Sequence, residues 1–479
     1  MNIINRSTNM VRICVVSVLL LSGLTACQQK KASFNESYVE VSPENPSYFC
    51  LSNGDTYIPV GLNMVHSYND MALMERWMKN LSENGGNYIR IWLGHEMFEY
   101  EKVYGKVNEE QIAKVDKVLE MAGKYGIKVK MCMENFREIT PDPGRNRKTA
   151  YHVDNGGPFT SMDDYMADDR GQKVFLDRAK FFKNRYGDDP RVFAWELWNE
   201  MNAIGISYED RDRLLIPWNA AVLSKMQEIF PKNLITQSLG SMDKTRSFPH
   251  YEGIMRIPEN DFIQVHRYLD EGAELPICQA PMDVLAADAI NHMRSYGVHK
   301  PVLLAETGGV EPSHSGPHRA YEKDHDGMIL HDLLFAPYFT GSAGPGHAWH
   351  WDVYVDKNNL WYHFRRFSNA VGGLDPVKEG FVPLRADQSG FRVYVLKGKN
   401  NSLVWARDTA NTWRTELIDG VEPSLRSRVS LDLSDVLKGC NLSKVEIYDP
   451  WMDQWTSGKA SALVTLPDFK RSIVLKIKH

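Results

Sequence analysis

Apolar and amphipathic segments alternate along residues 57–351. Eight short apolar runs have the length of buried strands, and they lie at residues 57–62, 87–93, 127–133, 192–199, 234–238, 262–267, 301–306 and 347–351. Between them, apolar residues recur at helical spacing, as at Leu73, Trp77 and Leu81. The alternation predicts an α/β fold, a closed parallel (β/α)8 TIM barrel. An open doubly wound sheet is the alternative, but no glycine-rich dinucleotide fingerprint follows the first run.

The pattern changes after residue 374. Runs with strand-like alternation and turn residues between them lie at 391–396, 402–406, 429–433, 445–448 and 473–477. Their spacing within about 100 residues predicts an antiparallel β-sandwich domain over residues 375–479. We interpret Trp413, Trp451 and Trp455 as core or interdomain packing, with a sugar-binding face as the alternative.

The N-terminus has the pattern of a secretory signal. Arg6 and Arg12 precede an apolar stretch at 13–21, and small residues follow. Leu24-Thr25-Ala26-Cys27 resembles a bacterial lipobox, which implies that Cys27 is lipidated; an ordinary signal peptide is the alternative. We therefore expect a signal peptide over 1–27, a tether over 28–44 and the barrel over 45–374. A lipid anchor predicts a location in the bacterial cell envelope, outside the cytoplasm, with contact to the membrane through the anchor only.

Composition narrows the class of ligand. With 56 basic and 61 acidic residues, the net charge of −5 is too small to favour nucleic acid. The aromatic content of 11% suits stacking on sugar rings. Cysteines in the mature chain show no CxxC spacing, which argues against a zinc site and against a disulfide scaffold. One disulfide among Cys50, Cys278 and Cys440 stays open.

A barrel focuses the search for function, because its chemistry collects where strands end and the following loops begin. Several polar and aromatic residues lie at or near the expected strand ends: Asn63, Arg90, Asn135, Asn199, Glu200, His266, Glu306 and Trp349. The segment 136–170 is unusually long for a loop, so we expect it to form a wall of the cleft.

Two of these residues are carboxylates that end apolar strands. Glu200 follows the fourth run, and burial there is expected to raise its pKa and suit it to act as a general acid. Glu306 ends the seventh run. The fourth and seventh strands of a barrel lie across its mouth, so the two side chains are expected to face each other over a substrate. Two facing carboxylates are the requirement for hydrolysis of a glycosidic bond.

Around these residues the sequence resembles clan A of the glycoside hydrolases, and within it family 5. The resemblance rests on Trp195-Glu196-Leu197-Trp198-Asn199-Glu200, on His266-x-Tyr268, on Glu306-Thr-Gly and on Trp349. It implies a retaining hydrolase of β-mannan or β-glucan type that needs no cofactor and no metal. Glu200 would be the acid/base and Glu306 the nucleophile, with carboxyl groups about 5–5.5 Å apart.

The resemblance also implies supporting roles. Arg90 and Tyr268 would keep Glu306 ionised, and Asn199 would bind the sugar 2-hydroxyl group. Trp349 would form the floor under the cleaved sugar, with Trp351 as the alternative platform. The remaining residues of the strand ends, Asn63, Asn135 and His266, are expected to bind substrate or support the site; His266 has a purely structural alternative.

Other residues have structural interpretations. Glu196 lies four residues before Glu200 and on the same side of the strand. It is therefore deeper in the barrel, and we expect it to pair with Arg90 there. A histidine- and aspartate-rich stretch is interpreted as a solvated loop, with substrate contacts or a metal site as alternatives; it contains His314, His318, Asp324, His325, Asp326, His331 and Asp332. The alternative function is a non-catalytic glycan-binding lipoprotein on the same fold.

Overall fold

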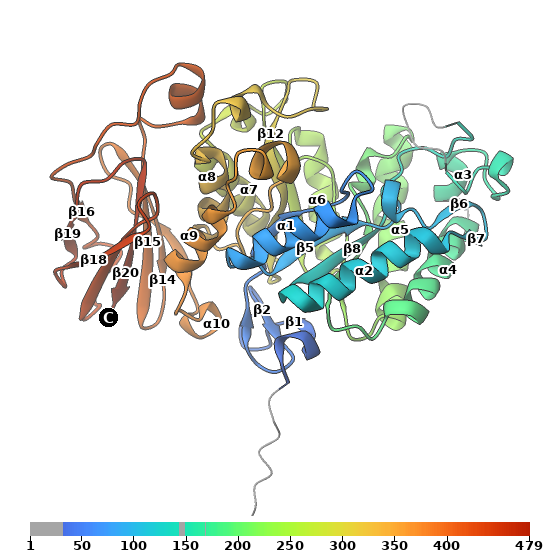
Figure 1. Cartoon of the computed structure of the whole chain (residues 1–479), viewed down its shortest axis with the longest axis horizontal. Helices are drawn as coiled ribbons and strands as arrows, with labels where there is room; N and C mark the ends of the chain where they lie inside the picture. Colours follow the sequence, from blue (N-terminus) through green and yellow to red (C-terminus); the bar gives the residue numbers. More distant parts are fainter. Residues whose placement is uncertain (1–31, 143–148, 168) are drawn as a thin grey trace, which may run out of the picture.

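The computed structural model describes residues 32–142, 149–167 and 169–479. Its larger part is a parallel barrel surrounded by helices (Figure 1). Five parallel strands are joined in the order β10 (Leu234–Thr236), β9 (Val192–Trp198), β8 (Lys128–Glu134), β5 (Tyr88–Trp92) and β4 (Gly61–Asn63). A parallel pair, β11 (Ile263–Asp270) and β12 (Val302–Val310), continues the barrel. The predicted α/β barrel is therefore confirmed.

The prediction of an eighth strand at residues 347–351 was wrong. Only Ala348 makes parallel bridges, to Leu62 on one side and to Thr307 on the other. These bridges still connect β12 with β4, so the barrel closes. Pairing cannot continue further, because the chain turns at Trp351 into a π-helical turn, η8 (Trp351–Asp356).

Helices follow the strands and pack outside the barrel. Their apolar faces meet the strands, and their ends carry ordinary caps: Asp70 accepts from the amides of Ala72 and Leu73, and Gly126 ends a helix with φ 63°. The principal helices are α1 (Met71–Glu83), α2 (Glu109–Tyr125), α4 (Asp169–Tyr186), α5 (Tyr208–Ile229), α6 (Phe248–Arg256), α7 (Met282–Ser295), α8 (Met328–Phe339) and α9 (Tyr362–Val371). A shorter helix, α3 (Met162–Ala167), lies in the long segment after β8.

A small sheet covers the amino ends of the barrel strands. It consists of β1 (Val39–Val41), β2 (Phe49–Leu51) and β3 (Thr56–Tyr57), and Phe49 packs edge-on against Phe193 and Phe262. The tether expected over 28–44 was therefore wrong at residues 39–41, because Val39 is buried and paired with Leu51. The signal peptide and Cys27 lie outside the described residues.

The C-terminal domain is antiparallel, as predicted. Its six-stranded sheet has the order β13 (Val382–Arg385), β14 (Phe391–Lys397), β15 (Asn401–Asp408), β20 (Ser472–Lys478), β17 (Lys444–Asp449) and β18 (Gln454–Gly458). A two-stranded sheet, β16 (Ser430–Asp432) with β19 (Leu463–Thr465), shares a second core with it. Sequence patterning missed β18 because all but the last of its residues are exposed, so it has no apolar alternation.

Helix α8 lies between the two domains (Figure 1). All its residues are buried, since it packs against β12 on one side and against β14 and β15 on the other. A buried ion pair crosses this interface, with Arg407 Nε 2.8 Å from Asp332 Oδ1. Trp413 and Trp451 also pack at the interface, in agreement with their structural interpretation, whereas Trp455 is 42% exposed.

Candidate active site

Glu200 and Glu306 meet at the carboxyl ends of the barrel strands. Glu306 lies on β12, and Glu200 follows β9 by two residues. Their carboxylate oxygens and a ring nitrogen of His266 lie within 4.8 Å of one another. This separation agrees with the spacing of about 5–5.5 Å that a retaining glycosidase requires. Both side chains are largely buried, with exposed fractions of 16% and 4%.

The backbone at Glu200 is held in an unusual conformation. Its φ of 52° and ψ of 54° lie in the left-handed region, which costs a residue with a side chain about 1–2 kcal/mol. Two contacts hold it there: Ser238 Oγ accepts from the Glu200 amide at 3.1 Å, and Arg137 donates to the Glu200 carbonyl at 2.9 Å. The strain occurs at the residue where the strand ends and the carboxylate turns toward Glu306.

Glu306 is surrounded by hydrogen-bond donors. Arg90 Nη1 donates to its Oε1, and the Tyr268 hydroxyl donates to its Oε2 at 2.8 Å. His266 Nδ1 lies 3.4 Å from the same Oε2. Burial raises the pKa of Tyr268, so the phenol keeps its proton and acts as a donor.

Arg90 is fully buried and joins both sides of the site. Its guanidinium group donates to Glu196 through two bonds of 2.7 Å and to Asn199 Oδ1 at 2.9 Å. A buried arginine requires such compensation. Lys130, also buried, lies 3.3 Å from Glu196, so two cations face the carboxylates of Glu196 and Glu306 in the barrel interior.

Glu200 has a different set of partners. His266 Nδ1 lies 2.9 Å from its Oε1, and Arg137 Nη2 lies 2.8 Å from its Oε2. Burial opposes ionisation, but the hydrogen bond from His266 and the charge of Arg137 outweigh it and lower the pKa of Glu200 to about 2. The expectation that burial would raise this pKa was wrong, because the contacts with His266 and Arg137 outweigh the effect of burial.

Residues 52–333, more than half of the chain, match the family described as Cellulase (glycosyl hydrolase family 5). The chain belongs to glycoside hydrolase family 5. It is therefore a β-glycoside hydrolase of a retaining family, as the paired carboxylates predict.

Individual relatives of this family 5 enzyme are distant. The chain is 27% identical to mannan endo-1,4-beta-mannosidase 7 of Arabidopsis thaliana over 358 residues, 69% of this chain and 76% of the relative. It is 22% identical to mannan endo-1,4-beta-mannosidase 4 of Oryza sativa, over 64% and 68% of the two chains. A solved family 5 structure from Bacteroides vulgatus shares the fold, with a TM-score of 0.60, 14% identity, and coverage of 93% and 94%.

Arg137 was missed by sequence reasoning. It lies in the long segment after β8, three residues beyond Glu134, the last residue of that strand. The only signal was the length of that loop, since a single arginine in a polar segment has no distinguishing pattern. The structure assigns it to Glu200 through both its side chain and its backbone.

The three predicted asparagines differ in their contacts. Asn63 is fully buried and donates its amide to the carbonyl groups of Ala305, His347 and Ala348 while accepting from Arg90, so it supports the site from below. Asn199 accepts from Arg90, which orients its amide group at the strand end. Asn135 follows β8 directly and is half-buried, and its substrate role stays a prediction.

The two candidate platforms differ in exposure. Trp349 is half-buried and packs against Trp92, with ring centroids 5.1 Å apart. Trp351 is 2% exposed and lies among His66, Trp77 and Trp349. Because only Trp349 retains accessible ring surface, it suits a sugar platform, whereas Trp351 is packing.

The prediction of a solvated loop over residues 314–332 was wrong for part of that segment. Asp324 is buried and caps α8 by accepting from the amides of Met328 and Ile329. His331 and Asp332 lie on α8 and are buried at the domain interface. The sequence pattern failed because α8 is apolar on all sides except for these two residues.

Two groups of side chains bring ligand atoms within 4.8 Å of one another and so resemble metal sites. One is the pair of site carboxylates with His266, and the other comprises Asp243, Asp270 and His314. His314 Nδ1 already contacts Asp270 at 2.9 Å. The double displacement of a retaining glycosidase uses carboxylates alone.

The described cysteines, at 50, 132, 278 and 440, are free thiols.

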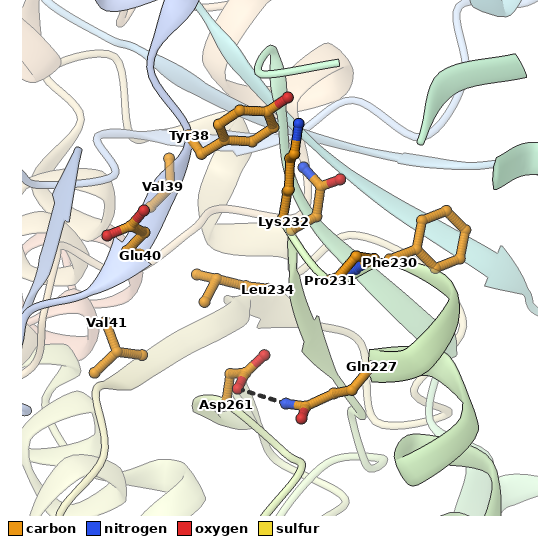
Figure 2. Close-up of a pocket in the computed structure, with 11 residues that line it drawn as sticks. Tyr38, Val39, Glu40, Val41, Gln227, Phe230, Pro231, Lys232, Leu234 and Asp261 are labelled. Carbon is orange, nitrogen blue, oxygen red and sulfur yellow. Dashed lines mark hydrogen bonds between the residues drawn. The ribbon is translucent and has the colours of Figure 1, made fainter. Parts of the chain in front are cut away.

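A hollow of about 710 Å³ lies at the opposite end of the barrel. Its lining includes residues of β1, the segment that leads into β10, and Asp261 just before β11. Figure 2 shows Gln227 bonded to Asp261 at its base, with Tyr38 and Lys232 above. The active sites of TIM-barrel enzymes lie at the carboxyl ends of the strands, so this hollow is not the active site.

Proposed function

We propose that this family 5 enzyme hydrolyses β-1,4-mannan chains internally, with Glu306 as nucleophile and Glu200 as acid/base. The observation that carries the proposal is the pair of carboxylates within 4.8 Å, each with its own donors. An assembled pair of this kind favours hydrolysis over the alternative of a non-catalytic glycan-binding protein.

In the first step Glu306 attacks the anomeric carbon and the glycosidic bond breaks. Glu200 gives its proton to the departing oxygen, so the leaving group departs as a neutral hydroxyl. Arg90 and Tyr268 donate to Glu306, which keeps the nucleophile ionised until its oxygen bonds to carbon.

In the second step the roles reverse. Glu200, now a carboxylate, takes a proton from water, and the resulting oxygen attacks the anomeric carbon as the bond to Glu306 breaks. His266 and Arg137 stabilise Glu200 in this ionised state. The first step requires the protonated form, and a bound sugar favours it by excluding water and further desolvating the carboxylate.

Mannan is proposed as the substrate because the two relatives described above are named mannan endo-1,4-beta-mannosidases. The Trp-Glu-Leu-Trp-Asn-Glu strand agrees with this class. Product analysis on β-mannan, β-glucan and xylan tests the proposal. We expect a rapid fall in mannan viscosity with release of mixed oligosaccharides. Faster release from glucan or xylan, or release of one small product without loss of viscosity, would contradict it.

We also propose that Cys27 anchors the enzyme in the bacterial cell envelope by a lipid. The support is the lipobox-like stretch that precedes it in the sequence. Within residues 32–142, 149–167 and 169–479, none of the helices combines the length and the apolarity that a bilayer crossing requires. Replacement Cys27→Ala should move the enzyme from the membrane fraction to the soluble fraction of fractionated cells. Unchanged membrane association would contradict the proposal.

A further inference from the structure

A hollow of about 500 Å³ adjoins the carboxylates on the side of Glu200. Glu200 is part of its lining, together with Asn202 and Ala203, residues of α5, residues of the segment 240–250, and His314. Neither Glu306 nor Trp349 contributes to the lining. If Glu200 protonates the departing oxygen, this hollow takes the leaving-group end of the chain. That assignment rests on the proposed function.

Two guanidinium groups gather around one ring in this hollow. Tyr208 is 56% exposed, and the Cζ atoms of Arg246 and Arg211 lie 4.3 and 4.9 Å from its ring centroid. Over the described part of the chain, neither arginine has a carboxylate within 4.0 Å. Burial and the charge of Arg246 lower the pKa of Arg211, as expected for two like charges held close together.

Two further carboxylates line the hollow, and each lies beside a partner other than the two arginines. Asp212 pairs with His250 at 2.6 Å, and Asp243 lies 3.8 Å from Lys244. Arg211 donates to the backbone carbonyl groups of Ile204 and Ile206, and its buried Nε has no hydrogen-bond partner among the described residues. Glu200 pairs with Arg137 outside the lining, which leaves two carboxylates, Asp212 and Asp243, against three cations in the lining: Arg211, Lys244 and Arg246. The hollow therefore carries an excess of positive charge.

We propose that this hollow binds an anionic substituent, a carboxylate or a sulfate ester, on the sugar at the leaving-group side of the scissile bond. A guanidinium group presents donors in a planar fork that matches such oxyanions. A neutral mannan chain has no group that would compensate two adjacent arginines. The enzyme would thus select β-glycans that carry acidic decorations, beyond its action on neutral chains.

Matched aryl β-mannobiosides test the proposal, because their aryl group occupies the leaving-group side. The probes are the 3-carboxyphenyl, 3-sulfophenyl and neutral 3-carbamoylphenyl glycosides. Binding is measured by calorimetry on the full chain carrying Glu306→Ala, so that no probe is consumed. We expect at least one anionic probe to bind about five- to tenfold more tightly than the carbamoyl probe, with the difference reduced in about 0.5 M salt.

Charge removal then locates the effect. Arg246→Gln removes an exposed guanidinium group, so the fold is expected to persist, and Arg211→Gln provides a second variant. Both should abolish the preference for the anionic probe. The matched control is Arg213→Gln, on the same helix but paired with Asp210 and outside the hollow; it should retain the preference.

The outcomes separate this inference from the proposed function. Equal binding of all three probes, or a preference that survives both Arg246→Gln and Arg211→Gln, would overturn it. A preference for the carboxyl or the sulfo probe alone would support it and identify the anion. Hydrolysis by the wild-type enzyme is measured in parallel. Failure to cleave any mannobioside would contradict the proposed function, while the binding comparison still decides the inference.

Discussion

Arg137 Nη2 lies 2.8 Å from Glu200 Oε2, and the same guanidinium group also donates to the Glu200 carbonyl oxygen. Glu306 has a separate arginine, Arg90, which is fully buried, whereas Arg137 is 26% exposed. Each carboxylate of the site is therefore tuned by its own cation. The one beside Glu200 lies in the loop after β8, so a change there alters the surroundings of Glu200 and leaves the contact between Arg90 and Glu306 in place.

Replacement Arg137→Met should shift the pH dependence of activity. Removing the positive charge destabilises the Glu200 carboxylate, so the pKa of Glu200 rises from its low value and the acid form persists to higher pH. We expect the alkaline limb of the kcat profile, which reports the substrate complex, to move upward by about one pH unit or more. Arg137→Lys should restore most of the original profile. An unchanged limb in Arg137→Met would show that Arg137 does not act through Glu200.

Replacement Glu200→Gln should make activity depend on the leaving group. Without an acid, a phenyl mannobioside must expel a basic phenolate, and kcat/KM should fall by about 10³-fold. A 2,4-dinitrophenyl leaving group needs little protonation, so kcat/KM for that substrate should fall by less than about tenfold. Equal losses for the two substrates would contradict an acid role for Glu200.

Replacement Trp349→Ala should weaken substrate binding. The ring offers the half-buried surface on which a sugar can stack, and we expect kcat/KM on mannan oligosaccharides to fall about tenfold or more. Trp351→Phe, in the buried neighbour, should instead lower the melting temperature. Steady-state kinetics and thermal unfolding of both variants are the measurements. A larger kinetic loss in Trp351→Phe would reverse the assignment of the two rings.

Replacement Arg407→Met should destabilise both domains together. It leaves the Asp332 carboxylate buried at the interface without its partner, which costs about 3–5 kcal/mol. Calorimetry should show a single unfolding transition at lower temperature, and the double variant Arg407→Met with Asp332→Leu should recover much of the loss. Two separate transitions would contradict the view that the domains unfold as one unit.

The barrel was predictable because its signal is periodic. Buried parallel strands appear as apolar runs, and seven of the eight expected runs contain strands of the barrel. The eighth could not be excluded from the pattern, since residues 347–351 are apolar and aromatic. Its backbone bonds at Ala348 depend on the neighbouring strands, and the π-helical turn at Trp351 is not encoded by any local periodicity.

The site was partly predictable for a related reason. Glu200, Glu306 and Arg90 follow or interrupt strands, where a charge is unusual and the barrel geometry fixes its position. Arg137 and the pair Arg211 with Arg246 lie in loops and on a helix surface, where charged residues are common. Their contacts with Glu200 and Tyr208 arise only from the folded path of those segments.

Trapping of the covalent intermediate tests the central claim most directly. The probe is a 2-deoxy-2-fluoro-β-mannosyl fluoride. Its 2-fluoro substituent slows both steps, and its reactive fluoride leaving group keeps the first step faster than the second, so the glycosyl-enzyme accumulates. Peptide mass spectrometry after proteolysis should locate one glycosyl group on the side chain of Glu306. Attachment to Glu200 or Glu196, or turnover of the donor without any labelled peptide, would contradict the account.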